Sequence, residues 1–490
     1  MMTIKNRLDE QELIHLTMLA HQNYGITANF QKLLWAILSY LKTVWFAFLA
    51  GTTLVPSKVA KPGFYEEPKG QSSAESDDIL ARIKEIKDDN EAAALLQNMI
   101  ETDGAGSWPP KVSSNVSSWP AALRPYHEIW FEMSPQLSVP EVSLDDEVNN
   151  KLRKQFRDRM TKLLNERVDI AAVEALLSAV DAGNQSAIPR DVYNGWATIP
   201  AVKVAQLEKT IEYPSALIFP WPFFNRYYGF DNLAGNVMSN FIYNWKPDHG
   251  IVYKINEGRT EEIMRAEFYF TYMFIETERL ALPIYLEIAL SLRAHRAGDR
   301  TALLASLHRL NTSLRVVMKV FYDNMVAHKL SRDAWQPYVQ GFHAYGAGAP
   351  GPDGAHTESD GVSANQLPFF HAVDALLGLG TYLTAGEMAS AVPVAQRRFS
   401  DEVRRQGLRQ EVREAGDDEV EALLGGIAKQ LRVWRAAHRV RIVPYFDRPA
   451  PERMLMTAGK SLLETKGVQN IKGALEYVDK LLRERMYETA

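Results

Sequence analysis

His438 and Arg435 lie one helical turn apart in the stretch 419–446, where apolar residues recur at helical spacing. The apolar face contains Leu424, Ile427, Leu431, Trp434 and Ile442, and His438 falls within it. A histidine on such a face is either a hydrogen-bonded core residue or a ligand to a buried group, and this helix alone leaves both interpretations open. We expect Pro444 to end the helix, because proline has no N–H and disfavours helix in the preceding residue.

Other residues offer weaker chemical signals. His371 also lies in an apolar helical pattern and is a rival candidate ligand. The aromatic run 268–274 is either core or the wall of a pocket. The sequence contains no HExxH or HxH metal spacing and no GxSxG elbow, and its Gly-rich segment 346–354 lacks phosphate-binding spacing. The residues by themselves therefore indicate a protein that could hold a flat apolar cofactor.

The absence of cysteine from all 490 residues narrows the chemistry. It excludes disulfides, thiolate catalysis, cysteine-ligated zinc, iron–sulfur clusters and thiolate-ligated haem. It also agrees with a reducing compartment, and residues 1–30 show no secretory signal, so we predict a cytoplasmic protein. A net charge of −5 without a long basic run argues against nucleic acid as a partner.

The elements that must position these residues are helices. Helical periodicity predicts helices within 77–102, 148–180, 233–245, 260–292, 301–329, 362–380, 385–393, 419–446 and 471–484. No period-2 run is long enough for a substantial sheet, so we predict an all-α fold. Pro283 is expected to kink its helix. The segment 214–230 carries so many prolines and aromatic residues that we expect irregular packed structure there.

Two further segments have distinctive compositions. The most apolar stretch, 33–55, is long enough to cross a membrane, but Lys42 lies near its middle. We therefore expect a buried or amphipathic helix there, with peripheral membrane or partner contact as one role. The Gly/Pro-rich segment 341–361 is expected to be a mobile lid or a disordered loop.

From about residue 214 onward, several segments in collinear order resemble the indoleamine 2,3-dioxygenase family. They cover a little over half of the chain. They are the asparagine–tryptophan at 244–245, the distal-side helix at 268–284 with Glu276, S-A-N-Q at 363–366 followed by FFHAVDALLG, VPVAQRRF at 392–399, and WRAAHRVRIVPYF at 434–446. Each motif is short, and their shared order carries the resemblance.

The resemblance implies a two-domain helical haem b protein. A small helical domain, 108–255, would cover the distal side of the haem, and a larger helical domain, 256–490, would bind the haem from below. Residues 1–107, which have no counterpart in the family, are expected to form an N-terminal helical extension with a linker, of unknown role. His438 would be the proximal iron ligand, Arg435 would pair with a haem propionate, and Asp374 would orient Arg435. His371 would then be a packing residue.

The family inserts both atoms of O2 across the indole 2,3 bond of tryptophan, so the resemblance implies a haem-dependent oxygenase with a small indole-like substrate. The matched pocket positions are Phe268, Tyr269 and Tyr272 on the distal helix and Val237, Asn240 and Phe241 on the last helix of the smaller domain. Ser363, Ala364 and Asn365 would lie beside the edge of the haem.

Some matched positions differ from the family. Trp335 and Gln340 occupy the positions of a phenylalanine and of the arginine that binds the substrate carboxylate, and glutamine has no charge to offer. Tyr272 stands in place of the distal serine, and Asn365 in place of the glycine of S-A-G-Q. Arg332 is a candidate replacement for the missing cation. Two alternatives follow: a divergent haem enzyme that oxidises another aromatic substrate in specialised metabolism, and a non-catalytic haem-binding protein.

Overall fold

The computed structural model divides the chain into two compact units, 1–66 and 67–490. All described residues belong to the second unit. The continuous described stretches are 73–103, 116–137, 145–184, 214–229, 236–246, 250–340, 364–381 and 383–446, and short strands and isolated positions add to them. The apolar stretch 33–55 and most of 341–361 and 471–484 lie outside the described residues.

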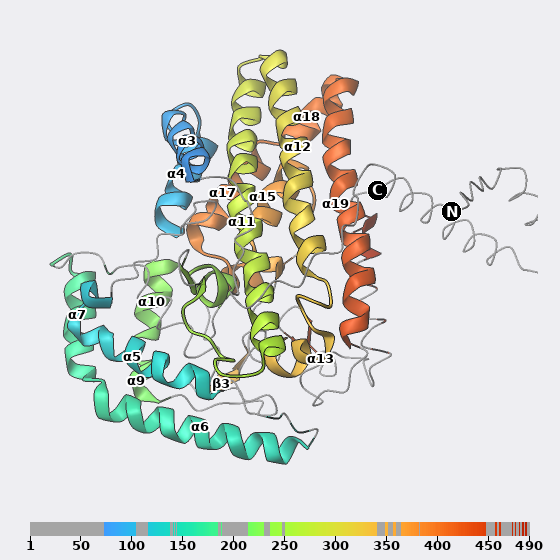
Figure 1. Cartoon of the computed structure of the whole chain (residues 1–490). Helices are drawn as coiled ribbons and strands as arrows, with labels where there is room; N and C mark the ends of the chain where they lie inside the picture. Colours follow the sequence, from blue (N-terminus) through green and yellow to red (C-terminus); the bar gives the residue numbers. More distant parts are fainter. Residues whose placement is uncertain are drawn as a thin grey trace, which may run out of the picture. The chain divides into compact units, whose positions relative to one another are not determined.

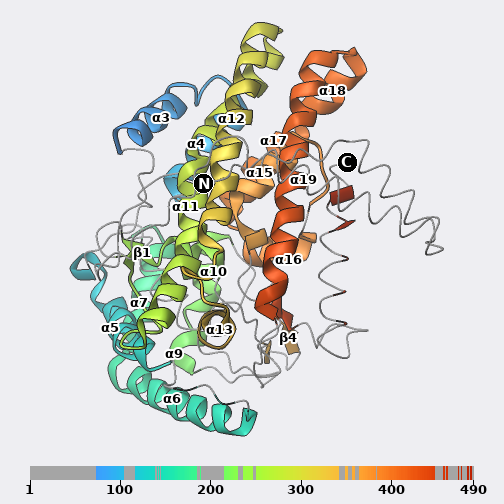
Figure 2. The same cartoon turned by 45° about the vertical axis from the view of Figure 1, so that its right-hand side comes forward.

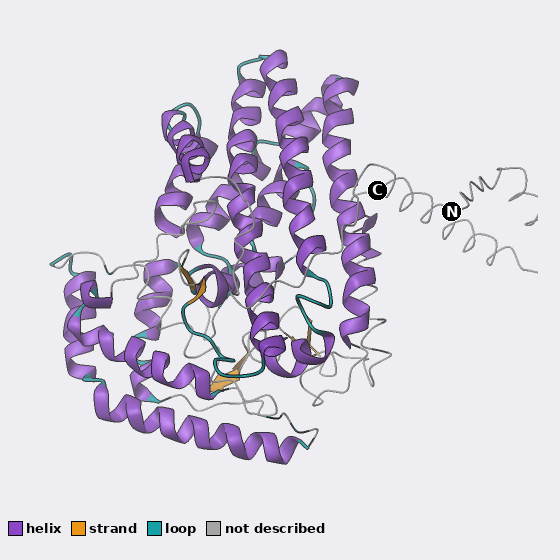
Figure 3. Ribbon diagram, viewed as in Figure 1, coloured by secondary structure: helices purple, strands orange, loops and turns teal. Residues whose placement is uncertain are grey.

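Helices make up nearly all of the described structure, which confirms the predicted all-α fold (Figure 3). The described strands form three antiparallel ribbons of two strands each. The pairs are β1 (Trp245–Lys246) with β2 (Gly250–Ile251), β3 (Gly348–Pro350) with β4 (His356–Glu358), and β5 (Met456–Thr457) with β6 (Lys460–Ser461). Within the described stretches, no helix combines the length and the apolar character needed to cross a membrane.

Three long helices, α11 (Glu261–Arg296), α12 (Arg300–Asn324) and α19 (Asp418–Phe446), lie side by side (Figures 1 and 2). A short turn reverses the chain between α11 and α12. The α12 helix then begins at the N-cap Asp299, whose side chain accepts a hydrogen bond from the backbone N–H of Ala302. The α19 helix runs parallel to α12. Arg441 of α19 donates to the carbonyl oxygens of Tyr322 and Met325, which lie at the end of α12.

Further helices pack on this bundle. The α15 helix (Pro368–Leu376) contacts α11 and α17 (Val394–Arg405), and α18 (Leu408–Ala415) contacts α19. The short α16 (Ala385–Ala391) contributes Met388 and Ala391 to a small separate hydrophobic cluster. Buried Glu278 of α11 accepts a hydrogen bond of 3.1 Å from the backbone N–H of Phe369 near the start of α15. This contact fixes the start of α15, the helix that carries Asp374.

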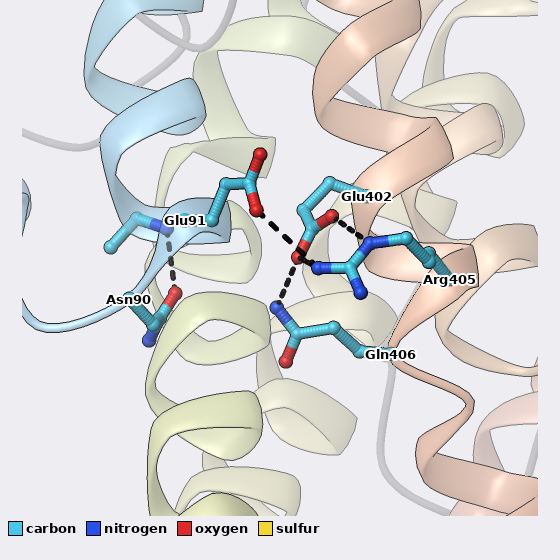
Figure 4. Close-up of polar contacts among 6 residues, drawn as sticks. Asn90, Glu91, Glu402, Arg405 and Gln406 are labelled. Atoms are coloured by element: carbon cyan, nitrogen blue, oxygen red, sulfur yellow. Dashed lines mark hydrogen bonds and ion pairs between the residues drawn. The ribbon is translucent and has the colours of Figure 1, made fainter.

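The helices α3 (Ser73–Glu85) and α4 (Glu91–Asp103) also pack against α11, and α4 contacts α17. Figure 4 shows the polar contacts at this interface. Buried Glu402 accepts two hydrogen bonds from Arg405 and one from Gln406, and Arg405 also reaches Glu91 of α4 at 3.4 Å. Residues that precede the predicted boundary at 107 therefore pack on helices from the C-terminal half of the chain.

The remaining helices contribute to a hydrophobic cluster with the first half of α11. They are α5 (Arg124–Met133), α6 (Asp146–Arg167), α7 (Ile170–Asp181), α9 (Ser215–Ile218), α10 (Trp221–Tyr228), α13 (Arg332–Ala334), and the π-helical turns η4 (Met238–Ile242) and η5 (Trp335–Gln340). The 3-10 turns η1 (Val116–Ser118), η2 (Ala121–Leu123), η3 (Ser134–Gln136) and η6 (Ala364–Gln366) connect them to their neighbours.

The core consists of two large hydrophobic clusters that share α11. The first cluster contains α11 residues from Ile263 to Ile275 together with α5, α7, α10, η4 and η5. The second contains α11 residues from Ala281 to Ala294 together with α3, α4, α12, α15, α17 and α19. Phe370 of α15 packs against both clusters. The domain boundaries at 107 and 255 stay predictions.

Several local predictions were wrong. The α19 helix continues two residues past Pro444, because a proline in the last turn leaves only the Val440 carbonyl without its helical donor, and Val440 is exposed. The segment 214–230 forms α9 and α10, since a proline in the first turn of a helix removes an N–H that has no helical acceptor. The predicted helical stretch 77–102 is two helices, and 233–245 holds only the turn η4 among its described residues. The surface helices predicted within 148–180 are confirmed as α6 and α7.

Candidate functional site

A buried ion pair links α15 to α19. Arg435 Nη2 lies 3.0 Å from Asp374 Oδ1 and 3.1 Å from Asp374 Oδ2, and both side chains are almost fully buried. Two charges taken out of water are costly unless they neutralise each other, so this pair holds the guanidinium in one orientation. The structure therefore brings together two of the residues predicted to bind the cofactor.

His438 lies one turn after Arg435 on α19 and is surrounded by aromatic rings. Its ring stacks on Trp434, with centroids 5.3 Å apart and planes at 13°, and lies 4.9 Å from the ring of Phe321 on α12. Phe370 of α15 lies 5.0 Å from Trp434. The side chain of His438 is only partly buried, while its Nδ1 atom is fully buried, so its accessible surface belongs to its other atoms.

The electrostatics of this position favour a neutral imidazole. Burial among these rings lowers the pKa of His438 from its ordinary value of 6.5 to about 4. At neutral pH the ring is therefore uncharged, and a neutral imidazole nitrogen is the form that binds a metal ion. Its surroundings thus fit iron ligation and do not favour a charged histidine.

Two buried polar atoms in this turn of α19 have no hydrogen-bond partner among the described residues. They are Nη1 of Arg435 and Nδ1 of His438. A buried donor or acceptor without a partner costs about 1–3 kcal/mol, so each such atom requires an explanation, and a bound group is one. A haem propionate would be an anionic acceptor for Arg435 Nη1, while Asp374 occupies Nη2. The residues present therefore fit a haem, although the atoms in question would also fit another anionic ligand.

No other set of side chains in the described stretches offers a metal site. Within them, no group of three or more histidine, aspartate and glutamate side chains is arranged to hold a metal ion. His371 is buried on α15, as expected for a packing residue. Of the two histidines considered as ligands, His438 is the one that lies one turn from the Arg435–Asp374 ion pair.

The predicted distal residues gather in the first hydrophobic cluster. Phe268 and Tyr272 stack with centroids 5.7 Å apart, and the ring of Trp245 lies 5.2 Å from Phe268 and 5.6 Å from Tyr272. Phe241 stacks on Phe274 at 4.4 Å. Phe321, which contacts His438, also packs against this cluster. Phe321 therefore contacts the candidate iron ligand and the same hydrophobic cluster that contains the predicted distal residues.

Tyr272 belongs to a buried polar network on α11. Glu276 and Arg279 form an ion pair in which Nε of Arg279 lies 2.7 Å from Oε2 of Glu276, and both are less than a tenth exposed. Burial raises the pKa of the Tyr272 phenol, and the neighbouring Glu276 carboxylate raises it further. The phenol is therefore protonated at neutral pH and is a hydrogen-bond donor at the position where the family has a serine.

The S-A-N-Q segment also lies next to the distal residues. Gln366 of η6 accepts a hydrogen bond of 3.0 Å from the backbone N–H of Val237, which immediately precedes η4. Ala364 and Asn365 are half-buried in η6, and Ala364 packs against the first hydrophobic cluster. Ser363 and the side chain of Gln340 lie outside the described residues. Trp335 is buried, with its ring 6.1 Å from Phe270 and 5.5 Å from Tyr445.

Sequence reasoning did not find some of the residues around this site. Phe321 and Phe370 were not singled out, although Phe321 lies on the periodic apolar face of α12, which was a usable signal. Lys329 was also missed: its ammonium lies 4.9 Å above the ring of Tyr269. Nothing in the sequence marks that contact, since the two residues are 60 positions apart on different elements.

In comparisons with known proteins, no family model matches this chain and no curated protein matches it. The resemblance to the indoleamine 2,3-dioxygenase family therefore rests on the collinear motifs.

Proposed function

We propose that this protein is a haem-dependent oxygenase that resembles the indoleamine 2,3-dioxygenases and acts on an aromatic, indole-like substrate. The observation that carries the proposal is the turn of α19 in which Arg435, paired with Asp374, and a neutral His438 each present a buried polar atom without a partner among the described residues. A haem b group with an anionic propionate and an iron centre would complement both side chains.

In this proposal each residue of the turn has a separate task. His438 would hold the iron through a neutral imidazole nitrogen, and Trp434 and Phe321 would fix the plane of its ring by packing. Arg435 would bind a propionate with Nη1 while Asp374 keeps the guanidinium from rotating. The haem would supply the binding of O2, which the amino acids of the chain cannot provide.

On the opposite side, the aromatic residues would bind the substrate and exclude water. The rings of Phe268, Tyr272 and Trp245 form a largely apolar wall, as a flat aromatic substrate requires. Holding the substrate ring in a fixed orientation beside O2 lowers the entropy cost of the reaction. The lack of cysteine agrees with histidine ligation and with the cytoplasmic location that we propose.

An absorption spectrum of the purified protein tests the haem directly. We expect a Soret band after expression with haem supply, and a changed ferrous–CO spectrum and loss of haem in His438→Ala. His371→Ala is the matched control and should keep the normal ligation spectrum. If His438→Ala binds haem with an unchanged ferrous–CO spectrum, the ligand assignment is wrong; if the wild-type protein binds no haem, the function is wrong.

A second candidate function is oxidation of another aromatic substrate by the same haem site. The buried network of Tyr272, Glu276 and Arg279 supports it, because the network holds a protonated phenol, a larger polar group, at the position where the family has a serine. Turnover of L-tryptophan to N-formylkynurenine, measured with reductant and O2, separates the two functions. Efficient turnover would eliminate the second candidate. A haem protein that consumes no O2 with any indole or phenol would instead be a non-catalytic haem-binding protein.

A further inference from the structure

The turn at 325–331 follows α12 and is closed by its own backbone. The backbone N–H of Val326 bonds to the carbonyl of Asn324 at 2.8 Å, and that of Leu330 bonds to the carbonyl of Val326 at 2.8 Å. In a continued helix the N–H of Val326 would instead bond to the carbonyl of Tyr322. Because α12 stops here, the carbonyl of Tyr322 takes its hydrogen bond from another element.

Arg441 of α19 supplies that hydrogen bond. Its Nη1 donates to the carbonyl oxygen of Tyr322 at 2.9 Å and to that of Met325 at 3.3 Å. Its guanidinium also lies 5.0 Å from the centroid of the Tyr322 ring, a cation–π contact that favours one orientation of both side chains. The start of the turn is thus fixed to α19 directly after Phe321, whose ring lies 4.9 Å from that of His438.

Tyr445 of α19 holds the end of the same turn. Its hydroxyl donates to the carbonyl oxygen of Leu330 at 2.9 Å, and its ring lies 5.5 Å from that of Trp335 with the planes at 77°. Tyr445 and Leu330 are both buried, so removal of the hydroxyl would leave this carbonyl without a donor. The ring of Trp335 lies in turn 6.1 Å from that of Phe270 in the first hydrophobic cluster.

Both contacts come from the side of α19 that carries the candidate iron ligand. Arg441 follows His438 by three positions and precedes Tyr445 by four, and residues at these spacings lie on one side of a helix. One end of the turn leads to the ring that packs on His438, and the other end leads to the ring that faces the first hydrophobic cluster. Capping of α12 accounts for the contacts of Arg441 alone, whereas Tyr445 reaches a carbonyl beyond the end of that helix.

We propose that Arg441 and Tyr445 are positioning residues of the site, which set the aromatic rings at the two ends of the turn 325–331. Arg441 sets the ring of Phe321 against the candidate iron ligand. Tyr445 sets the ring of Trp335 against the aromatic residues that we assign to the substrate. The inference rests on the proposed function for what these rings do, and on the contacts of α19 for where they lie.

The test is fluorine NMR of the full chain labelled with a fluorinated tryptophan. The chain has ten tryptophans, and the resonances of Trp335 and Trp434 are assigned by their loss in Trp335→Phe and Trp434→Phe. Trp434 reports on Phe321, because the centroids of the two rings lie 5.6 Å apart. For each variant the free energy of unfolding in urea and the absorption spectrum are measured in parallel.

The variants separate positioning from stability. Tyr445→Phe removes the hydroxyl and keeps the ring, Arg441→Met removes the donor to the two carbonyls, and Arg441→Lys keeps a donor on a long side chain. The matched control is Arg432→Met, which removes a half-buried guanidinium from the same helix. Arg432 forms no hydrogen bond or ion pair with the residues that the structure describes.

We expect the Trp335 resonance to broaden or split in Tyr445→Phe, because the ring then samples more than one position, and the Trp434 resonance to do so in Arg441→Met. Arg441→Lys and Arg432→Met should give one sharp line for each of the two tryptophans, as in the wild type. Should Arg441→Met not fold, the Trp335 resonance of Tyr445→Phe decides the inference.

A single sharp line for Trp335 in Tyr445→Phe overturns the inference even where the line is shifted, since loss of a neighbouring hydroxyl alone produces such a shift. A lower free energy of unfolding with unchanged lines also overturns it, because contacts that only stabilise the fold give that result. The absence of a Soret band would overturn the proposed function without altering the fluorine lines, so the two failures are distinguishable.

Discussion

The neutral state of His438 is expected to make the stability of the protein depend on pH. In the unfolded chain the imidazole titrates near its ordinary pKa of 6.5, whereas in the folded protein burial lowers the pKa to about 4. The unfolded state therefore binds a proton first as the pH falls, and folding stability decreases below about pH 6.5 until the folded ring is also protonated below about pH 4. His438 therefore lowers the free energy of unfolding at acidic pH and has no such effect at neutral pH, where the ring is uncharged in both the folded and the unfolded state.

The magnitude follows from the two pKa values. Since each pKa unit corresponds to about 1.4 kcal/mol, the shift from 6.5 to about 4 costs about 3 kcal/mol once both states have titrated. At about pH 5 the unfolded ring is almost fully protonated and the folded ring is not, so the loss is about 2 kcal/mol. Replacement by leucine removes the titration while it keeps an apolar side chain against Trp434 and Phe321.

The assay is urea unfolding followed by far-ultraviolet circular dichroism at about pH 7.5 and about pH 5. Between these two conditions we expect the wild-type protein to lose about 2 kcal/mol more than His438→Leu. The other titrating groups contribute equally to both proteins and cancel in this difference. The control is His308→Leu, which replaces an exposed histidine and should behave like the wild type. Equal losses in the wild type and in His438→Leu would refute the argument that burial keeps this ring neutral.

Three other substitutions test the framework of the site. Asp374→Asn leaves the guanidinium of Arg435 buried without a counter-charge and should lower the free energy of unfolding by about 3 kcal/mol. The double substitution of Asp374→Leu with R435M should lower that free energy by less than the sum of the two single substitutions. Gly229→Ala places a Cβ against the side chain of Val394 at a φ of 72° and should cost about 2 kcal/mol or more in thermal unfolding, part of which V394A should restore. Asp299→Ala removes the N-cap of α12 and should cost about 1 kcal/mol, with faster amide exchange in its first turn, whereas Asp299→Asn should exchange like the wild type.

The sequence predicted the long helices well because their apolar periodicity is strong. The helix predicted at 260–292 is α11, Glu261–Arg296, which contains Pro283. The kink expected at Pro283 stays a prediction. The helix predicted at 301–329 ends earlier, at Asn324, since the following residues form the turn that Arg441 holds by two carbonyl contacts. Periodicity alone cannot detect such a stop, because a side chain from another helix forms it.

The buried ion pair of Arg435 and Asp374 was anticipated only through the resemblance. The two residues are 61 positions apart, and neither propensity nor spacing joins a charge on one helix to a charge on another. Tyr272 was placed at the distal position in the same way, but its partners Glu276 and Arg279 could have been found from the sequence, since spacings of four and three residues put all three on one helical face. The contact between Lys329 and Tyr269 required the three-dimensional arrangement.

The α11 helix contributes to both hydrophobic clusters, which affects whether fragments of the chain can fold on their own. A fragment that ends at the predicted boundary, residue 255, keeps α5, α10 and η4 but loses the apolar side chains of α11 that cover them. These are Ile263, Ala266, Phe268, Phe270, Tyr272, Met273, Phe274 and Ile275. Each large side chain of this kind contributes about 1.5–3 kcal/mol when buried, so the fragment would expose an apolar surface and aggregate. A fragment that begins at residue 256 would expose the other half of the same interface. We therefore expect the two clusters, which share α11, to unfold together rather than as separate halves.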